Sequence, residues 1–308
     1  MRLMVVLMAL TASGLLAGPQ SPTVETGYVG SNACKACHPA ITVSYYKNPH
    51  YKQMASASDE HRAEAGCESC HGPGKAHVEG RGLRSAIKAF STMEPAAILE
   101  NCLRCHSQTI SRANIRRSAH TQNDVVCTSC HGIHKAVTPK ALLSKPQTDL
   151  CYTCHASVKA QFSMPFKHRV NEGFMKCSDC HNPHGAAAPT WRMASRPRMV
   201  DSSGNEEPCL RCHTDKRGPF VFEHAAVRVD GCESCHSPHG STNARLLRRP
   251  VVLTLCLECH NGLGSFGRSS SGVPSTSSSH SLSDPRYQNC TTCHVRIHGS
   301  NADSRFLR

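Results

Sequence analysis

The sequence has few of the residues from which a conventional hydrophobic core is built. Only 5% of its 308 residues are aromatic, and Trp191 is the single tryptophan. Its 21 glycines and 18 prolines interrupt nearly every longer apolar run. A chain of this length usually forms about two domains around apolar cores. The composition argues against such cores, so something other than side chains must fill the interior.

Long hydrophobic segments are also missing, apart from one at the start of the chain. Arg2 precedes an apolar run from Leu3 to Leu10, and small residues follow through Ala17. This is the layout of a secretory signal peptide, and the run is shorter than the roughly 18 apolar residues that a membrane-spanning helix needs. We expect residues 1–17 to be a signal peptide and residues 18–308 to form the exported protein.

Cysteine and histidine are abundant instead, with 20 and 21 copies. The pattern Cys-x-x-Cys-His occurs ten times and uses every cysteine. The cysteine pairs are Cys34 and Cys37, Cys67 and Cys70, Cys102 and Cys105, Cys127 and Cys130, Cys151 and Cys154, Cys177 and Cys180, Cys209 and Cys212, Cys232 and Cys235, Cys256 and Cys259, and Cys290 and Cys293. The histidines that follow them are His38, His71, His106, His131, His155, His181, His213, His236, His260 and His294.

This spacing is the one that covalent haem attachment needs. Two thiols one helical turn apart reach the two vinyl groups of one porphyrin, and the next histidine reaches the iron as the proximal ligand. Zinc sites pair two Cys-x-x-Cys hooks per metal and do not require a histidine after each hook. Disulfide frameworks do not repeat one pentapeptide ten times. The motifs therefore predict ten haem c groups.

Eleven histidines lie outside the motifs, and ten irons need ten sixth ligands. We predict His50, His77, His120, His134, His168, His184, His224, His239, His280 and His298 as the distal ligands. His61 is then spare, although His50 and His61 could exchange these roles. With enough histidines for all ten irons, methionine ligation is not expected. Uniform bis-histidine ligation favours electron transfer over substrate chemistry at iron.

The motifs and the other histidines form five dihaem modules in tandem, a self-similarity typical of repeat architectures. Each module has a motif, a lone histidine, a second motif, and a histidine three to six positions after the second proximal one. The clearest copies span residues 151–185 and 209–240. A histidine three residues after a proximal ligand cannot reach the opposite face of the same haem. We expect it to bind the iron of a neighbouring haem.

The predicted fold is a multihaem cytochrome c, with short helices and loops wrapped around haem and little or no sheet. Residues 40–54 and 94–106 are helical candidates, and residues 265–283 read as a serine-rich loop. The approximate halves are residues 28–163 and 164–308. The porphyrins form the core, so the haem-free chain should not fold.

The charge of +13 does not require nucleic acid as a partner. Ten haems carry about 20 propionates, which gives about −7 for the ferrous protein and about +3 for the ferric protein. The basic stretch Arg245–Arg249 is accordingly read as a solvated face or a propionate partner rather than a docking site.

The residues also resemble those of the periplasmic decahaem cytochromes of the MtrA and DmsE family. The resemblance covers most of the chain and is sharpest in CSDCHNPHG from Cys177, CHTDKRGPFVFEHA from Cys212, CESCHSPHGS from Cys232 and CHVRIHGSNADSRFLR from Cys293. It implies an elongated rod of two pentahaem halves inside an outer-membrane β-barrel porin. The implied partners are that porin, a periplasmic electron donor or acceptor, and an extracellular cytochrome or reductase.

Three functions are compatible with these observations. The resemblance favours an electron conduit across the outer membrane, with no substrate chemistry of its own. A soluble periplasmic shuttle or electron store is an alternative that differs only in its partners. A multihaem reductase of a small nitrogen or sulfur compound would need a haem with an open axial position, which the histidine count disfavours.

Overall fold

The computed structural model describes residues 27–54, 66–108, 110–185, 208–260, 280, 282 and 284–307. The predicted signal peptide, His61 and most of the predicted serine-rich loop lie outside these residues. The chain divides into two compact units, Met1–Pro39 with Gln53–Ala89, and Ala40–Lys52 with Phe90–Arg308. The predicted halves at residues 28–163 and 164–308 stay a prediction.

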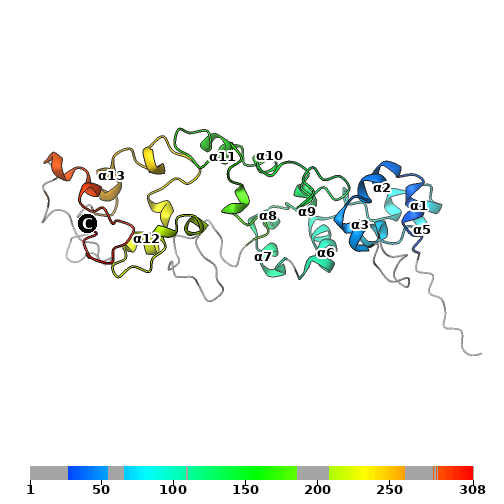
Figure 1. The fold of residues 1–308 in the computed structure, drawn as a ribbon. Helices are drawn as coiled ribbons and strands as arrows, with labels where there is room; N and C mark the ends of the chain where they lie inside the picture. Colours follow the sequence, from blue (N-terminus) through cyan, green and yellow to red (C-terminus); the bar gives the residue numbers. More distant parts are fainter. Residues whose placement is uncertain are drawn as a thin grey trace, which may run out of the picture. The chain divides into compact units, whose positions relative to one another are not determined.

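Short helices joined by loops make up the described part of the chain (Figure 1). The α-helices are α1 (Ser31–Lys35), α2 (Pro39–Tyr45), α3 (Pro49–Met54), α4 (Cys67–His71), α5 (Lys75–Glu79), α6 (Pro95–His106), α7 (Arg112–Arg116), α8 (Ala119–Gln122), α9 (Cys127–Cys130), α10 (Gln147–Tyr152), α11 (Ala156–Gln161), α12 (Ala225–Val229) and α13 (Val252–Leu257). None of them is long and apolar enough to cross a bilayer.

Both segments predicted to be helical contain helices. Residues 40–54 are divided into α2 and α3, because a proline at position 49 cannot continue a helix and instead begins the next one. At α6, Pro95 occupies the first helical position after the extended Glu94. Helices α3 and α6 therefore each begin at a proline, which fits the first position of a helix.

The remaining regular elements are 3-10 helices. They are η2 (Arg84–Ala86), η3 (Cys177–Asp179), η5 (Pro208–Arg211), η6 (Thr214–Lys216), η7 (Cys232–Ser234), η8 (Ala244–Leu246), η10 (Pro285–Tyr287) and η11 (Cys290–Thr292). No sheet occurs among the described residues, where β-pairing is confined to isolated antiparallel bridges. The predicted fold class, short helices and loops of a multihaem cytochrome c, is confirmed.

A buried carboxylate organises the first unit. Glu68 in α4 is 2% exposed and accepts hydrogen bonds from the backbone N–H groups of Val29, Gly30 and Gly74, the last two at 2.7 Å. Such charge-assisted bonds offset the cost of burying a carboxylate. Glu68 therefore ties the start of α1, the motif helix α4 and the start of α5 together.

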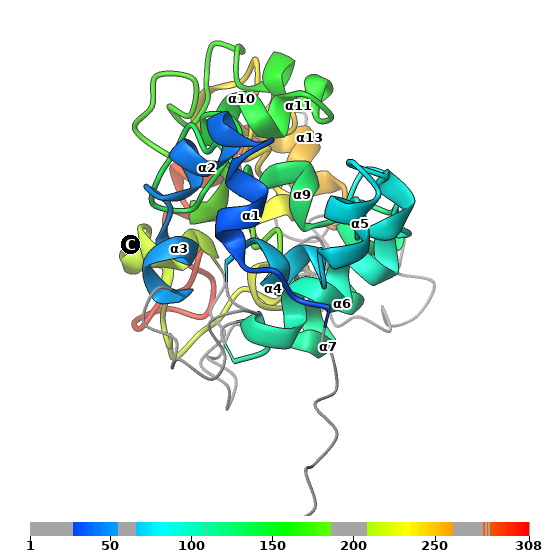
Figure 2. The ribbon, with the colours of Figure 1, turned by 90° about the vertical axis from the view of Figure 1, so that its right-hand side faces the viewer.

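The second unit contains a small apolar cluster rather than a large core. Leu99 and Leu103 of α6 pack against Ile115 of α7, and these two helices lie side by side in Figures 1 and 2. In the described parts of the chain, eight hydrophobic side chains are buried. The sparse apolar packing agrees with the prediction from composition.

Repeated backbone contacts join successive modules of the second unit. Phe166 and Ser241 exchange two backbone hydrogen bonds of 3.1 and 2.8 Å, and Phe222 and Ser300 exchange two of 2.8 and 2.9 Å. Each phenylalanine lies two residues before a lone histidine, and each serine follows a His-Gly pair. The bridge therefore brings the two kinds of distal histidine segment next to each other.

Candidate haem sites

Each Cys-x-x-Cys-His motif forms a single helical turn. In eight motifs the histidine N–H donates to the carbonyl of the first cysteine at 2.9 to 3.0 Å, and the other two motifs lie in α4 and at the end of α6. Residues three apart on such a turn share a face. The two thiols therefore point the same way, and none of the twenty cysteines forms a disulfide.

The proximal histidines face distal candidates in nine pairs. The pairs are His38 with His77, His106 with His50, His131 with His184, His155 with His120, His181 with His239, His213 with His168, His236 with His298, His260 with His224, and His294 with His280. Their ring centroids are 5.8 to 6.4 Å apart.

This spacing fits a metal between each pair of rings. An imidazole nitrogen binds a first-row transition metal at about 2.0 Å, and the ring centre lies about 1 Å behind it, so two rings across one metal have centroids about 6 Å apart. The interplanar angles range from 14° to 79°, while the centroid spacing hardly changes. If the two rings packed directly against each other, the distance between their centroids would change with the interplanar angle. A shared iron fixes the centroid distance and leaves the angle free. The histidines thus fit haem iron.

Hydrogen bonds at Nδ1 leave Nε2 of many of these rings for the metal. A protonated Nδ1 bonded to a carbonyl fixes the tautomer, orients the ring and makes Nε2 a stronger ligand. The contacts are His71 with Lys88 O, His77 with Leu83 O, His120 with Pro183 O, His131 with Ala141 O, His168 with Pro238 O, His236 with Arg245 O and His294 with Arg305 O, at 2.5 to 3.1 Å.

Burial keeps several of these imidazoles in the neutral form that binds metals. It lowers the pKa of His298 to about 4, with a further contribution from nearby Lys216. Burial also lowers the pKa of His50, His181, His184, His224 and His239. Nδ1 of His224 is itself buried without a hydrogen bond, although the nearby Ile297 backbone raises the pKa slightly against the effect of burial.

The pairs follow a rule along the repeat. A histidine shortly after the second motif faces the second proximal histidine of the preceding module, as in His184 with His131 and His298 with His236. A lone histidine between two motifs faces the first proximal histidine of the next module, as in His168 with His213. In seven of the nine pairs, the two histidines thus come from neighbouring modules.

The two end modules depart from this rule because one neighbour is missing. His77 faces His38 within the first module, and His280 faces His294 within the last one. His71 and His134, the other two predicted ligands, stay predictions. The structure places His50 opposite His106, whereas His61 lies outside the residues that it describes.

The sequence analysis did not predict the segments whose backbone carbonyls accept hydrogen bonds from three of the proximal histidines. Leu142, Leu246 and Phe306 have positive φ values of 51°, 59° and 60°, and the carbonyl just before each of them accepts the bond from His131, His236 or His294. The segments read Ala-Leu-Leu-Ser, Arg-Leu-Leu-Arg and Arg-Phe-Leu-Arg. That recurring pattern was a usable signal, but its distance from the motif varies.

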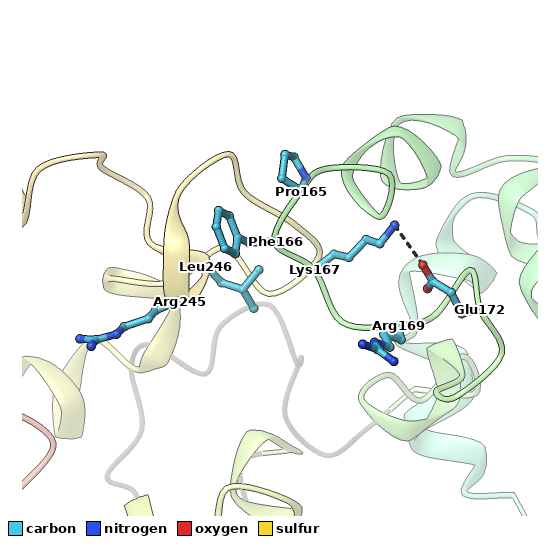
Figure 3. Close-up of a pocket in the computed structure, with 7 residues that line it drawn as sticks. All are labelled: Pro165, Phe166, Lys167, Arg169, Glu172, Arg245 and Leu246. Atoms are coloured by element: carbon cyan, nitrogen blue, oxygen red, sulfur yellow. Dashed lines mark ion pairs between the residues drawn. The ribbon is translucent and has the colours of Figure 1, made fainter.

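A cavity of about 480 Å³ adjoins one of these segments (Figure 3). Its lining combines apolar and basic side chains: Pro165, Phe166, Lys167, Arg169, Glu172, Arg245 and Leu246. Lys167 forms an ion pair of 3.0 Å with Glu172. The cavity lies beside the chain on both sides of His168, so it belongs to the surroundings of the histidine sites rather than to a separate centre.

Comparisons with known proteins find multihaem cytochromes. The family described as "Doubled CXXCH motif" matches residues 119–160, 168–218 and 224–264, and the family "Cytochrome c554 and c-prime" matches residues 78–132. The multiheme cytochrome MtrA of Shewanella baltica is 33% identical over 286 residues, which cover 89% of this chain and 80% of that protein. The C-type polyheme cytochrome OmcB of Geobacter sulfurreducens is 26% identical over 81% of this chain but only 31% of its own length.

Proposed function

We propose that this chain, which belongs to the MtrA family of multihaem c-type cytochromes, carries electrons across the outer membrane through ten bis-histidine haems. Family membership rests on the 33% identity to MtrA over most of both chains. It makes the chain a multihaem electron-transfer protein. The number of haems, the ligand set and the conduit role are the parts that we propose.

The nine histidine pairs are the observation that carries the proposal. Each pair holds one imidazole from a haem-attachment motif and one from elsewhere, at a spacing that suits a single iron. When bound, haem supplies one-electron redox chemistry. The chain itself would hold each ring and supply both axial imidazoles, and burial lowers the pKa of His50, His181, His184, His224, His239 and His298. Filled axial positions support electron relay and disfavour a reductase.

The interleaved pairing supports a continuous relay. An inner module would supply one histidine to a haem of the next module and bind its own haem through a histidine of that module. Two such modules could not separate without breaking bonds between histidine and iron. Lys167, Arg169 and Arg245, which line the cavity of Figure 3, offer positive charge for haem propionates. Covalent attachment and axial ligation would then set the distances between haems, rather than loose side-chain packing.

The partners follow from the same proposal. An outer-membrane porin would hold the cytochrome, a periplasmic carrier would exchange electrons at one end, and an extracellular cytochrome or reductase would do so at the other. The signal peptide predicted for residues 1–17 supports a periplasmic location, where cytochrome c maturation occurs.

Liposomes loaded with a reducible dye test the conduit. The chain is co-reconstituted with a candidate outer-membrane porin from the same organism, and a membrane-impermeant reductant is supplied outside. We expect dye reduction that needs both proteins, with porin alone and chain alone as controls. No reduction, despite ten haems confirmed by mass and absorption, would reject the conduit and favour a soluble electron shuttle.

A further inference from the structure

The tripeptide Asn-Pro-His occurs twice, and its two copies differ in their surroundings. It occupies residues 48–50 and 182–184, and in both copies the asparagine Oδ1 accepts the histidine backbone N–H, at 2.9 and 3.1 Å. Asn48 is only 5% exposed, whereas Asn182 is exposed. The shared turn is local, so any difference in role arises from tertiary packing.

Packing fixes the orientation of the buried amide. Asn48 Nδ2 donates to the carbonyl of Ile133 at 2.5 Å. A carbonyl only accepts, so the amide nitrogen must face Ile133 and Oδ1 must face His50. The backbone N–H of His50 requires the same orientation. Two independent contacts therefore settle which amide atom meets the imidazole.

That orientation determines the protonation of His50. Oδ1 of Asn48 lies 3.1 Å from Nδ1 of His50, and because Oδ1 only accepts, Nδ1 carries the proton. Nε2 is then the unprotonated nitrogen, and the ring faces His106 with a centroid distance of 5.8 Å. In the other copy, Asn182 Oδ1 accepts only the His184 backbone N–H in the described part of the chain.

A second amide side chain acts on another distal ring. Oε1 of Gln161, at the end of α11, lies 3.0 Å from Nδ1 of His239, and His239 faces His181 at 5.9 Å. The seven other Nδ1 contacts described above use backbone carbonyls, which no substitution removes. At His50 and His239 the acceptor is a side chain and can therefore be changed.

We propose that Asn48 and Gln161 are positioning residues that orient His50 and His239 and set the reduction potentials of the two haems that these histidines ligate. A stronger acceptor at Nδ1 gives the imidazole more negative charge, which stabilises ferric iron and lowers the potential. The inference rests on the proposed axial ligation, because it needs both histidines on iron.

The first test compares the two Asn-Pro-His copies in the full-length holoprotein. Asn48→Ala removes the Nδ1 acceptor, the bond to the Ile133 carbonyl and the turn contact, whereas Asn182→Ala removes the turn contact alone. In a redox titration followed by electron paramagnetic resonance, we expect Asn48→Ala to move one haem to higher potential. The expected change in its ferric-to-ferrous ratio is about tenfold, the usual scale of such outer contacts. For one electron this corresponds to about 59 mV. Asn182→Ala should leave the potentials unchanged. Equal shifts in both variants, or none in Asn48→Ala, would overturn the role of Asn48.

Two substitutions of Gln161 are expected to shift the reduction potential of one haem in opposite directions. Gln161→Met keeps the size of the side chain and removes the acceptor, so one haem should move to higher potential. Gln161→Glu supplies a carboxylate, so the same haem should move to lower potential. Gln147→Met is the matched control, because Oε1 of Gln147 accepts from Ser178 and not from an imidazole. Shifts of the same sign in both Gln161 variants, or the same shift in the control, would indicate general loosening instead.

A final variant separates this inference from the ligation on which it rests. His50→Ala should leave one haem with an open position that binds carbon monoxide when reduced. If it does not, His50 is not an axial ligand and the proposed ligand set fails. If it does and Asn48→Ala shifts no potential, only the present inference fails.

Discussion

At the scale of single residues, the buried carboxylate of Glu68 is held by three specific backbone donors. The sequence of the motif does not reveal that Glu68 is buried and hydrogen-bonded. Glu68 and Glu233 occupy the same position in two Cys-Glu-Ser-Cys-His motifs, yet Glu68 is buried and Glu233 is exposed. The difference comes from what packs against each motif, which the local sequence does not contain.

Glu68→Gln is expected to loosen the first unit. The new amide places N–H groups against the backbone donors of Gly30 or Gly74, so at least one buried donor loses its acceptor, at a cost of about 2 kcal/mol. Hydrogen exchange around residues 29–30 and 74 should then accelerate by about 30-fold. Glu233→Gln is the control and should leave exchange unchanged. Equal protection in wild type and Glu68→Gln would show that the carboxylate does not stabilise the unit.

At the scale of elements, the loops that carry His184, His239 and His298 each present a distal histidine to the preceding module. The glycine that follows this histidine makes the approach possible. A Cβ at Gly240 would collide with the carbonyl oxygen of Gln161, and one at Gly185 would collide with that of Asn114. Because backbone lies on the opposing side, no rotamer change could relieve the clash.

Gly240→Ala should therefore displace the loop that holds His239. We expect the haem attached at His181 to lose its distal ligand in part of the molecules, seen as carbon monoxide binding after reduction. Gly173→Ala is the control, since Gly173 has a φ of 80° and open space around its Cβ position. Its cost is limited to about 1 to 2 kcal/mol of backbone strain. Carbon monoxide binding in Gly173→Ala alone would contradict this account.

At the scale of the whole molecule, side chains provide too little apolar contact to specify the fold. Leu103 and Leu210 are the hydrophobic side chains below 2% exposure in the described residues. Most helices there are one or two turns long, too short to be stable alone. The fold must therefore gain its stability from groups bound by the cysteines and histidines.

The haem-free chain is accordingly expected to be unfolded. Expression of residues 18–308 without export keeps the protein away from haem attachment, while the exported protein serves as the control. Circular dichroism should show little helix and no cooperative thermal transition for the haem-free chain. A cooperative transition in that sample would mean that side-chain packing alone specifies the structure.

The sequence by itself determined the chemistry of this protein. Ten Cys-x-x-Cys-His turns, a nearly matching set of further histidines and a poor core composition identify a multihaem cytochrome c, because covalent attachment and iron ligation each demand fixed residue types at fixed spacing. The helices near residues 40–54 and 94–106 also followed from local signals. Only the tertiary structure decided which rings face each other, which of two identical tripeptides is buried, and which carbonyls hold the imidazoles. These depend on contacts between residues far apart in the chain, which local spacing does not encode.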